Sequence, residues 1–279
     1  MAKNKLVAPF LKWVGGKRQI MPEVVERLPD NMKKYKYIEP FIGGGAVLLH
    51  LQPKKAIIND FNSELVNVYR VIKNNLEDLI IDLHKHNNEP DYFYEIRGID
   101  RKDEFKNLAE VERASRIIYL NKTCFNGLYR VNNSGEFNSP FGKYKNPNIV
   151  NEPTLRAVSH YLNTNDIQIQ NTDYEDVLQQ ADKNSFVYLD PPYYPVSESS
   201  NFTGYVQGGW NVADHTRLRE VCDKLDKKGV KFLQSNSSAD FIKEEYEQYN
   251  IHIIKANRSI NSDGEKRGEV EEVLIRNYE

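Results

Sequence analysis

The chain has little cysteine, no long apolar run and almost no net charge, and each lack excludes a class of protein. Cys124 and Cys222 are its only two cysteines among 279 residues, so neither a disulfide framework nor a C-x-x-C metal site is expected. No apolar stretch approaches the roughly 20 residues of a membrane helix, and the first residues lack the apolar core of a signal peptide. We therefore expect a cytoplasmic protein that has no metal site and does not bind a membrane.

The net charge is only −2, with 38 basic against 40 acidic residues. A surface that binds nucleic acid therefore has to be a local basic patch, because the chain as a whole has no excess of positive charge. The hydrophobic content of 39% and the charged content of 28% are ordinary for a folded globular protein. The length suits one large domain or a domain with a substantial insertion.

Residues 186–194 read Phe-Val-Tyr-Leu-Asp-Pro-Pro-Tyr-Tyr, a pattern typical of a buried strand that stops abruptly. Two prolines cannot donate to a sheet ladder, and Pro191 favours an extended Asp190. Open α/β sheets bind ligands at the carboxyl ends of their strands. Asp190, the carbonyls of Pro191 and Pro192, and the ring of Tyr193 suit a planar group with an amino substituent. A simple surface turn would also contain these residues.

Glycine-rich segments precede this motif. Residues 35–51 predict a strand, a turn at Gly43–Gly45 and a helix, the first βα unit of a nucleotide-binding sheet. The next strand, residues 55–60, ends at Asp60, where such sheets hold a ribose diol. Residues 10–18 add two glycines and three cations before a short helical stretch. The G-x-G-x-x-G fingerprint and the P-loop are both absent, so a nicotinamide dehydrogenase fits poorly.

Helical periodicity dominates residues 61–120, whereas residues 121–145 read as a hairpin around Asn-Asn-Ser-Gly. Glu136 is the one acid between residues 113 and 145. Six cations accompany it: Arg113, Arg116, Lys122, Arg130, Lys143 and Lys145. This local basic patch favours a hairpin that enters a groove of duplex DNA. A basic loop that merely covers the sheet is the alternative.

The α/β pattern resumes after residue 147. Helices are expected over residues 155–162 and 214–225, and strands over 167–169 and 229–237. Asp173 follows one of these strands, where a further ligand-facing group would lie. Residues 251–256 and 270–275 predict a closing antiparallel hairpin. His84 and His86 have no nearby cysteine partners and are interpreted as exposed helix residues.

Five segments together resemble the Dam-type DNA adenine-N6 methyltransferases of the α group. They are residues 12–17 (Lys-Trp-Val-Gly-Gly-Lys), 39–45 (Glu-Pro-Phe-Ile-Gly-Gly-Gly), 59–60 (Asn-Asp), 126–130 (Asn-Gly-Leu-Tyr-Arg) and 190–193 (Asp-Pro-Pro-Tyr). The resemblance covers nearly the whole chain. It implies an α/β fold with a Rossmann-like class I methyltransferase sheet, mostly parallel, ending in an antiparallel hairpin. Residues 1–60 and 156–279 would form the catalytic domain, and residues 61–155 an inserted helical and β-hairpin DNA-recognition domain.

The resemblance also implies roles for single residues. Asp190, Pro191, Pro192 and Tyr193 would receive a flipped adenine, and residues 197–209 would fold over it. S-adenosylmethionine would contact Trp13, Gly15, Lys17, Glu39, Pro40, Phe41, Gly43, Gly45, Asp60, Asp173 and Asp190. Double-stranded DNA, with GATC as the family's common target, would contact Lys12, Arg116, Asn126, Leu128, Arg130, Asn138, Pro140, Lys143 and Tyr205.

Two alternatives stay open beside this reading. An amino-methyltransferase acting on RNA or a free base would share the chemistry, but the basic hairpin and the long insertion argue against it. A nucleic-acid-binding protein with an inactive cofactor site is disfavoured by the intact glycine turn, Asp60 and Asp-Pro-Pro-Tyr. No obligate protein partner is evident, and a cognate restriction endonuclease fits the resemblance. The expected setting is the bacterial cytoplasm or a phage-infected cell.

Overall fold

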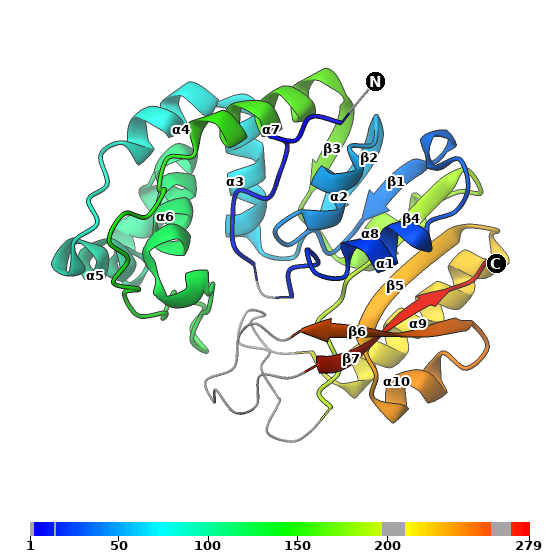
Figure 1. The fold of residues 1–279 in the computed structure, drawn as a ribbon. Helices are drawn as coiled ribbons and strands as arrows, with labels where there is room; N and C mark the ends of the chain where they lie inside the picture. The colour runs from blue at the N-terminus through cyan, green and yellow to red at the C-terminus, as the bar shows by residue number, and fades with distance from the viewer. Residues whose placement is uncertain (1–2, 14, 197–209, 258–268) are drawn as a thin grey trace.

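A seven-stranded sheet forms the centre of the protein. The computed structural model describes residues 3–13, 15–196, 210–257 and 269–279 (Figure 1). The strand order is β3-β2-β1-β4-β5-β7-β6. The strands are β1 (Lys36–Glu39), β2 (Lys55–Asn59), β3 (Asp166–Gln170), β4 (Ser185–Leu189), β5 (Lys231–Ser237), β6 (Asn250–Asn257) and β7 (Glu269–Arg276).

Strands β1 to β5 run parallel, and β7 is antiparallel to both β5 and β6. The mostly parallel sheet and the closing hairpin that the sequence predicts are therefore confirmed. All five residues of β4 are buried, as expected for a central strand with both faces covered. Because β1 and β4 are neighbours, the residues that follow their carboxyl ends emerge side by side.

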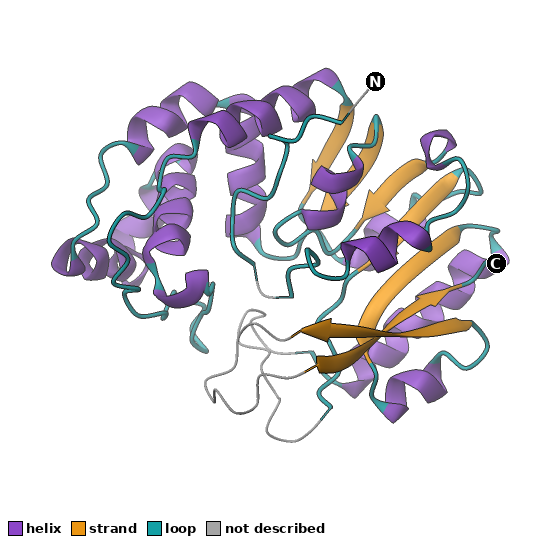
Figure 2. Ribbon diagram, viewed as in Figure 1, coloured by secondary structure: helices purple, strands orange, loops and turns teal. Residues whose placement is uncertain are grey.

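Helices cover both faces of the sheet (Figure 2). Alternate strand residues serve the two sides, since Tyr37 and Phe186 belong to one apolar cluster and Ile38 and Val187 to the other. The first cluster includes residues of α1 (Met21–Glu26), α2 (Ala46–Leu51), α3 (Ser63–Asn74) and α7 (Glu152–Thr164). The second includes residues of α8 (Tyr174–Gln179), α9 (Val212–Lys227) and α10 (Asp240–Glu245). The short helix α10 was not expected from the sequence.

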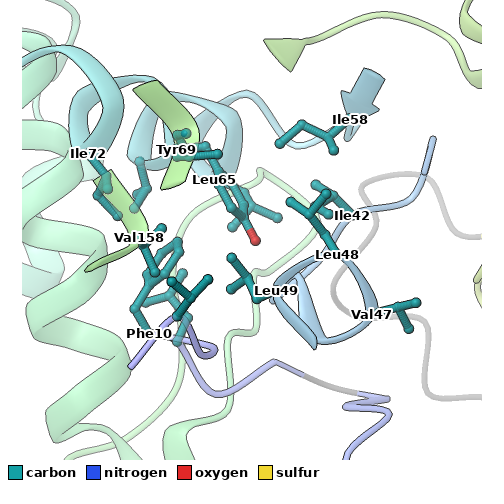
Figure 3. Packing of buried hydrophobic residues seen from close by; sticks show 14 of the residues in the cluster. Phe10, Ile42, Val47, Leu48, Leu49, Ile58, Leu65, Tyr69, Ile72 and Val158 are labelled. Carbon is teal, nitrogen blue, oxygen red and sulfur yellow. The ribbon is translucent and has the colours of Figure 1, made fainter. Parts of the chain in front are cut away.

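Between β2 and β3 the chain adds further helices beside the sheet (Figure 1). These are α4 (Leu76–Leu83), α5 (Pro90–Gly98) and α6 (Glu110–Thr123). Phe10 of the N-terminal segment lies buried against Tyr69 of α3, with ring centroids 5.1 Å apart (Figure 3). This contact fixes the N-terminal segment against α3.

The expected β-hairpin in residues 121–145 is only partly formed. Gly135 donates to the carbonyl of Asn132 and closes the predicted turn. Isolated bridges at Val131–Phe137 and Cys124–Phe141 stand in place of a continuous strand ladder. The Phe137 N–H donates to the side chain of Asp100, 2.7 Å away, so part of the backbone hydrogen bonding is directed to the helices. The segment reverses direction as predicted, but as a loop.

His86 is not the exposed helix residue that was expected. It follows α4, stacks on Tyr119 and hydrogen-bonds Tyr92 and Ser115. Burial lowers its pKa to about 4, so the ring is neutral at physiological pH. His84 is exposed, on the turn after α4.

Candidate active site

A cavity of about 320 Å³ opens beside the carboxyl ends of β1 and β4. Asp190 and the glycine turn after β1 face it together with the N-terminal segment. Its wall comprises Pro9, Leu11, Lys12, Trp13, Gly15, Gly16, Lys17, Arg18, Glu39, Ile42, Gly43, Gly44, Ala46, Val47, Lys122, Asn126 and Asp190. Residues predicted to contact cofactor, reacting base and DNA therefore share one cavity.

The glycine turn has close neighbours that exclude side chains. Gly43 has a φ of +48°, and a Cβ there would lie 2.8 Å from Cδ1 of Trp13. A Cβ on Gly45, with a φ of +69°, would lie 2.5 Å from the hydroxyl of Tyr69. That hydroxyl donates to the carbonyl of Gly43. Only glycine fits both positions, and the exposed backbone leaves room for a ligand.

Asp60, directly after β2, is oriented by backbone donors. Its Oδ2 accepts the N–H of Gly43 at 3.0 Å, and its Oδ1 accepts the N–H of Asn62 at 3.0 Å. Burial raises its pKa to about 6. A carboxylate has about four acceptor sites, so Asp60 retains capacity to accept a hydroxyl donor from a bound molecule.

Asp190, directly after β4, pairs with Lys17. The Nζ of Lys17 lies 2.8 Å from Oδ1 of Asp190, and Lys17 is only 4% exposed. The hydroxyl of Ser235 donates to the same oxygen at 3.0 Å. Burial raises the pKa of Asp190, and the charge and hydrogen bond of Lys17 oppose that rise. The charge of Lys17 therefore favours the ionised form of Asp190.

The Pro-Pro-Tyr segment is attached to the neighbouring strands. Tyr193 donates its hydroxyl to Glu272 of β7 at 2.9 Å, and Lys17 lies 4.8 Å from the centre of its ring. The N–H of Tyr194 donates to the side chain of Asn236 in β5. Pro191 and Pro192 are buried. These contacts fix the position of the Tyr193 ring beside Asp190.

Glu39, Pro40 and Phe41 lie at the end of β1, deeper than the glycine turn. Glu39 is 2% exposed and accepts the hydroxyl of Tyr37 at 2.7 Å. Burial raises its pKa well above the usual range, which favours a neutral carboxyl group. The carbonyl of Pro40 accepts from Asn59. The ring of Phe41 packs against Tyr174 and Trp210.

Asp173 lies at the start of α8 and has a partner that sequence reasoning missed. Its side chain accepts a hydrogen bond from the N–H of Glu175. It also accepts hydrogen bonds from both terminal nitrogens of Arg217, at 3.1 and 2.9 Å. Arg217, from α9, also lies over the ring of Tyr174. The signal available in the sequence was only an arginine on the exposed side of a helix, with nothing to indicate its target.

The predicted DNA-contacting residues gather around residues 121–145. Lys12, Asn126, Pro140 and Lys143 are exposed, whereas Leu128, Arg130 and Asn138 are partly buried. Arg130 donates to the side chain of Asn138 at 2.7 Å. Asn126 has a left-handed φ of 57°. Tyr205 and the rest of residues 197–209 lie outside the described residues.

Arg116 does not fit the DNA-contacting role predicted for it. It is 3% exposed, and its guanidinium lies 2.8 Å from the carboxylate of Asp100. It also donates to the carbonyls of Ile96 and Arg97. The position of this cation within a basic stretch suggested a surface role, but the side chain points into the helical region.

Two exposed aromatic residues near the site were not singled out from the sequence. Phe61 is 71% exposed and follows Asp60 directly, and Phe125 is 55% exposed and precedes Asn126. A large apolar ring beside a ligand-facing polar residue is the signal that would have found both.

The strand order, the glycine turn, the acidic end of β2 and the Asp-Pro-Pro-Tyr segment after β4 define a class I methyltransferase. The profile of the D12 class of N6 adenine-specific DNA methyltransferases matches residues 13–260. The chain belongs to this family.

Among the residues that the structure describes, no helix is long and apolar enough to cross a membrane.

Full-length relatives agree with the family. The Type II methyltransferase M1.LlaDCHI of Lactococcus lactis subsp. cremoris is 45% identical, over 100% of this chain and 98% of its own length. The Type II methyltransferase M.MjaIII of Methanocaldococcus jannaschii is 44% identical, over 98% of this chain and 99% of its own. The DNA adenine methylase of Haemophilus influenzae is 35% identical, over 95% of this chain and 92% of its own length. The protein is thus an adenine-specific DNA methyltransferase, and the family implies S-adenosylmethionine as the methyl donor.

Proposed function

We propose that the chain methylates N6 of an adenine flipped out of duplex DNA, with GATC as the target sequence. The observation that carries the proposal is the position of Asp190, a half-buried carboxylate directly after β4 that lines the same cavity as the glycine turn. GATC is the common target of the Dam-type enzymes that the sequence motifs resemble, and relatives named DNA adenine methylases are 32–35% identical to this chain.

The residues present fit S-adenosylmethionine. The glycine turn presents backbone to the cavity, and Asp60 keeps acceptor positions for a ribose diol. We assign Phe61 to the adenine face, with Asp173 at its edge. The remaining contacts fall to Trp13, Gly15, Lys17, Glu39, Pro40 and Phe41. When bound, this cofactor supplies a methyl group on a positively charged sulfur.

The chain itself has to activate the adenine amino group. Its nitrogen is a poor nucleophile, because its lone pair is delocalised into the ring. Hydrogen bonds from its two N–H groups to Asp190 and to a carbonyl of Pro191 or Pro192 favour a tetrahedral nitrogen with an available lone pair. The negative charge of Asp190 stabilises the positive charge that develops on this nitrogen. Tyr193 stacks on the base and holds it in place.

Lys17 already occupies one oxygen of Asp190 before the base arrives. In the structure the lysine ammonium donates to the carboxylate that is to accept the amino group of the base. A carboxylate accepts several hydrogen bonds, so the base can share Asp190 with Lys17 or displace it. Extruding the base costs a few kcal/mol, and these new contacts offset that cost.

DNA contact is assigned to residues 61–155 together with Lys12. Within this region Asn126, Leu128, Arg130, Asn138, Pro140 and Lys143 are proposed to read or wedge into the target. Residues 1–60 and 156–279 then form the catalytic part. The names of the two relatives at 44–45% identity as Type II methyltransferases support a cognate restriction endonuclease with the same sequence specificity.

The test is transfer of labelled methyl from S-adenosylmethionine to two duplexes, one with GATC and one with its adenine replaced. The proposal expects transfer to the first duplex only. Transfer to both would refute the GATC assignment while keeping the chemistry. Mapping N6-methyladenine in plasmid DNA then identifies the target actually modified. Absence of transfer to any DNA, by protein that binds the cofactor, would refute the proposed substrate.

A further inference from the structure

Asn121, near the end of α6, connects two segments that are distant in sequence. Its Oδ1 accepts the N–H of Lys12 at 2.9 Å, and its Nδ2 donates to the carbonyls of Lys12 and Gly127, at 2.7 and 2.9 Å. The residue is 1% exposed. One side-chain amide therefore holds both backbone groups of Lys12 and one backbone group of the DNA-recognition segment.

The two segments that Asn121 joins include residues assigned to both ligands. Gly127 lies between Asn126 and Leu128, which are assigned to DNA. Lys12 precedes Trp13, whose ring lies against Gly43 and Gly44 of the glycine turn. The same ring stacks on Tyr129 of the recognition segment, with centroids 4.8 Å apart and planes at 23°. A polar contact and an aromatic contact thus run in parallel between the two binding regions.

These contacts favour joint movement of the two segments. A buried backbone group without a hydrogen-bond partner costs more than the bond itself contributes. If the Lys12 segment shifted alone, two of its backbone groups would lose their partner in Asn121, and if the Gly127 segment shifted alone, one carbonyl would. The side chain of Lys12 fills the space above Gly127, where a Cβ would collide with its carbons. A displacement caused by DNA at residues 126–130 is therefore passed to Lys12 and Trp13.

We propose that Asn121 is a positioning residue that couples DNA recognition to cofactor binding, and this inference rests on the proposed function. DNA that seats residues 126–130 also fixes Trp13 against the glycine turn, so the cofactor binds tighter in the presence of target DNA. Linkage requires the reverse as well: the cofactor tightens DNA binding by the same factor.

The test measures the Kd of S-adenosylhomocysteine by calorimetry, with and without a short duplex that contains the sequence the wild-type enzyme methylates. The wild type is expected to gain about 5-fold or more in affinity with the duplex. Asn121→Asp has the same shape and still accepts the N–H of Lys12, but its second oxygen faces two carbonyls. The affinity gain is expected to fall toward 1 in this variant.

Asn67→Asp is the matched control. Asn67 is a buried asparagine of α3 that donates to the carbonyl of Glu110 at 2.8 Å, so this hydrogen bond goes to neither binding segment. It should keep the wild-type gain, since general destabilisation does not change the ratio of two affinities. If Asn121→Asp does not fold by circular dichroism, Tyr129→Leu, which removes the stack on Trp13, is expected to lower the gain.

Two results would overturn the inference while leaving the proposed function intact. One is a wild-type enzyme that methylates DNA but shows no gain. The other is a folded Asn121→Asp variant whose affinity for S-adenosylhomocysteine rises with the duplex as much as that of the wild type. If Asn121→Asp does not fold, the same result in Tyr129→Leu would overturn the inference. A wild-type protein that methylates no DNA would instead refute the proposed function, and this inference with it.

Discussion

Lys17 and Asp190 form an ion pair in the interior of the candidate site, with 2.8 Å between Nζ and Oδ1. Two residues far apart in sequence thereby define the charge state at the centre of the cavity. Burial raises the pKa of Asp190, and Lys17 holds it down. The active form is the carboxylate, because it must accept an N–H group.

Replacement of this lysine should therefore shift the pH dependence of the reaction. In Lys17→Met the pKa of Asp190 rises further, so protonation of the carboxylate begins at higher pH. The acid limb of kcat/KM for methyl transfer is expected to move to higher pH. Arg18→Met removes an exposed cation nearby and should leave the position of the limb unchanged. An acid limb that stays in place in Lys17→Met would contradict the role given to this pair.

The raised pKa of Asp60 leads us to expect that cofactor affinity also depends on pH. Its pKa in the free protein is raised to about 6, so the carboxylate becomes protonated as the pH falls through that value. Protonation removes acceptor capacity for hydroxyl donors, and the affinity for S-adenosylhomocysteine should fall below pH about 6. Calorimetry across this range measures it. Asp60→Asn should bind weakly and lose this pH dependence, and an Asn variant that keeps the wild-type profile would exclude Asp60 as its source.

Gly43 and Gly229 both have a positive φ. Their alanine variants distinguish the cost of a strained backbone from the cost of a steric clash. Alanine at Gly229, with a φ of +71° and no atom within 4 Å of its Cβ, has only the left-handed backbone to accommodate. Thermal unfolding should show a loss of about 1–2 kcal/mol. Alanine at Gly43 must also displace Trp13, so Gly43→Ala should be less stable still and bind the cofactor more weakly. Equal stability and unchanged cofactor affinity in the two variants would argue against a Trp13–Gly43 contact.

Arg116 and Arg130 should differ in what their loss affects. Arg116→Met removes the buried cation beside Asp100, which keeps Arg101 and the N–H of Phe137 as partners, and is expected to lower the free energy of unfolding by about 1–3 kcal/mol. Arg130→Met loses hydrogen bonds to Asn138, with an expected cost of about 1 kcal/mol, and should change DNA affinity or sequence preference. Urea unfolding and duplex binding measure the two effects. An Arg116→Met variant that is as stable as the wild type but binds DNA weakly would contradict the structural role of Arg116 and support a direct contact with DNA.

Local sequence pattern was sufficient for most of the sheet. The apolar run before Asp190 predicted β4, because a central strand is buried on both faces and the two prolines end it. The apolar spacing of α3 predicted its buried face, because residues three and four apart lie on one side of a helix. What failed depended on partners distant in sequence. Arg116 is buried because Asp100 meets it, and His86 is half-buried because Tyr119 stacks on it.

The site was predictable where it rests on short motifs and not where it rests on tertiary contacts. The glycine turn, Asp60 and Asp190 could be placed from the strands that precede them. The partners of Asp173 and Asp190 could not, since Arg217 comes from α9 and Ser235 from β5. The same holds for Asn121, which reads as an ordinary polar residue near a helix end and is identified only by its three hydrogen bonds.

Asp190 is proposed to activate the amino group of an adenine in DNA. The most direct test incubates wild type and Asp190→Ala with S-adenosylmethionine and duplex DNA, and quantifies N6-methyladenine by mass spectrometry of the digested DNA. The account predicts N6-methyladenine with the wild type and at least about a 100-fold slower rate with Asp190→Ala, although the variant still binds S-adenosylhomocysteine. A wild-type rate in Asp190→Ala, or a methyl group found on another base, would contradict it.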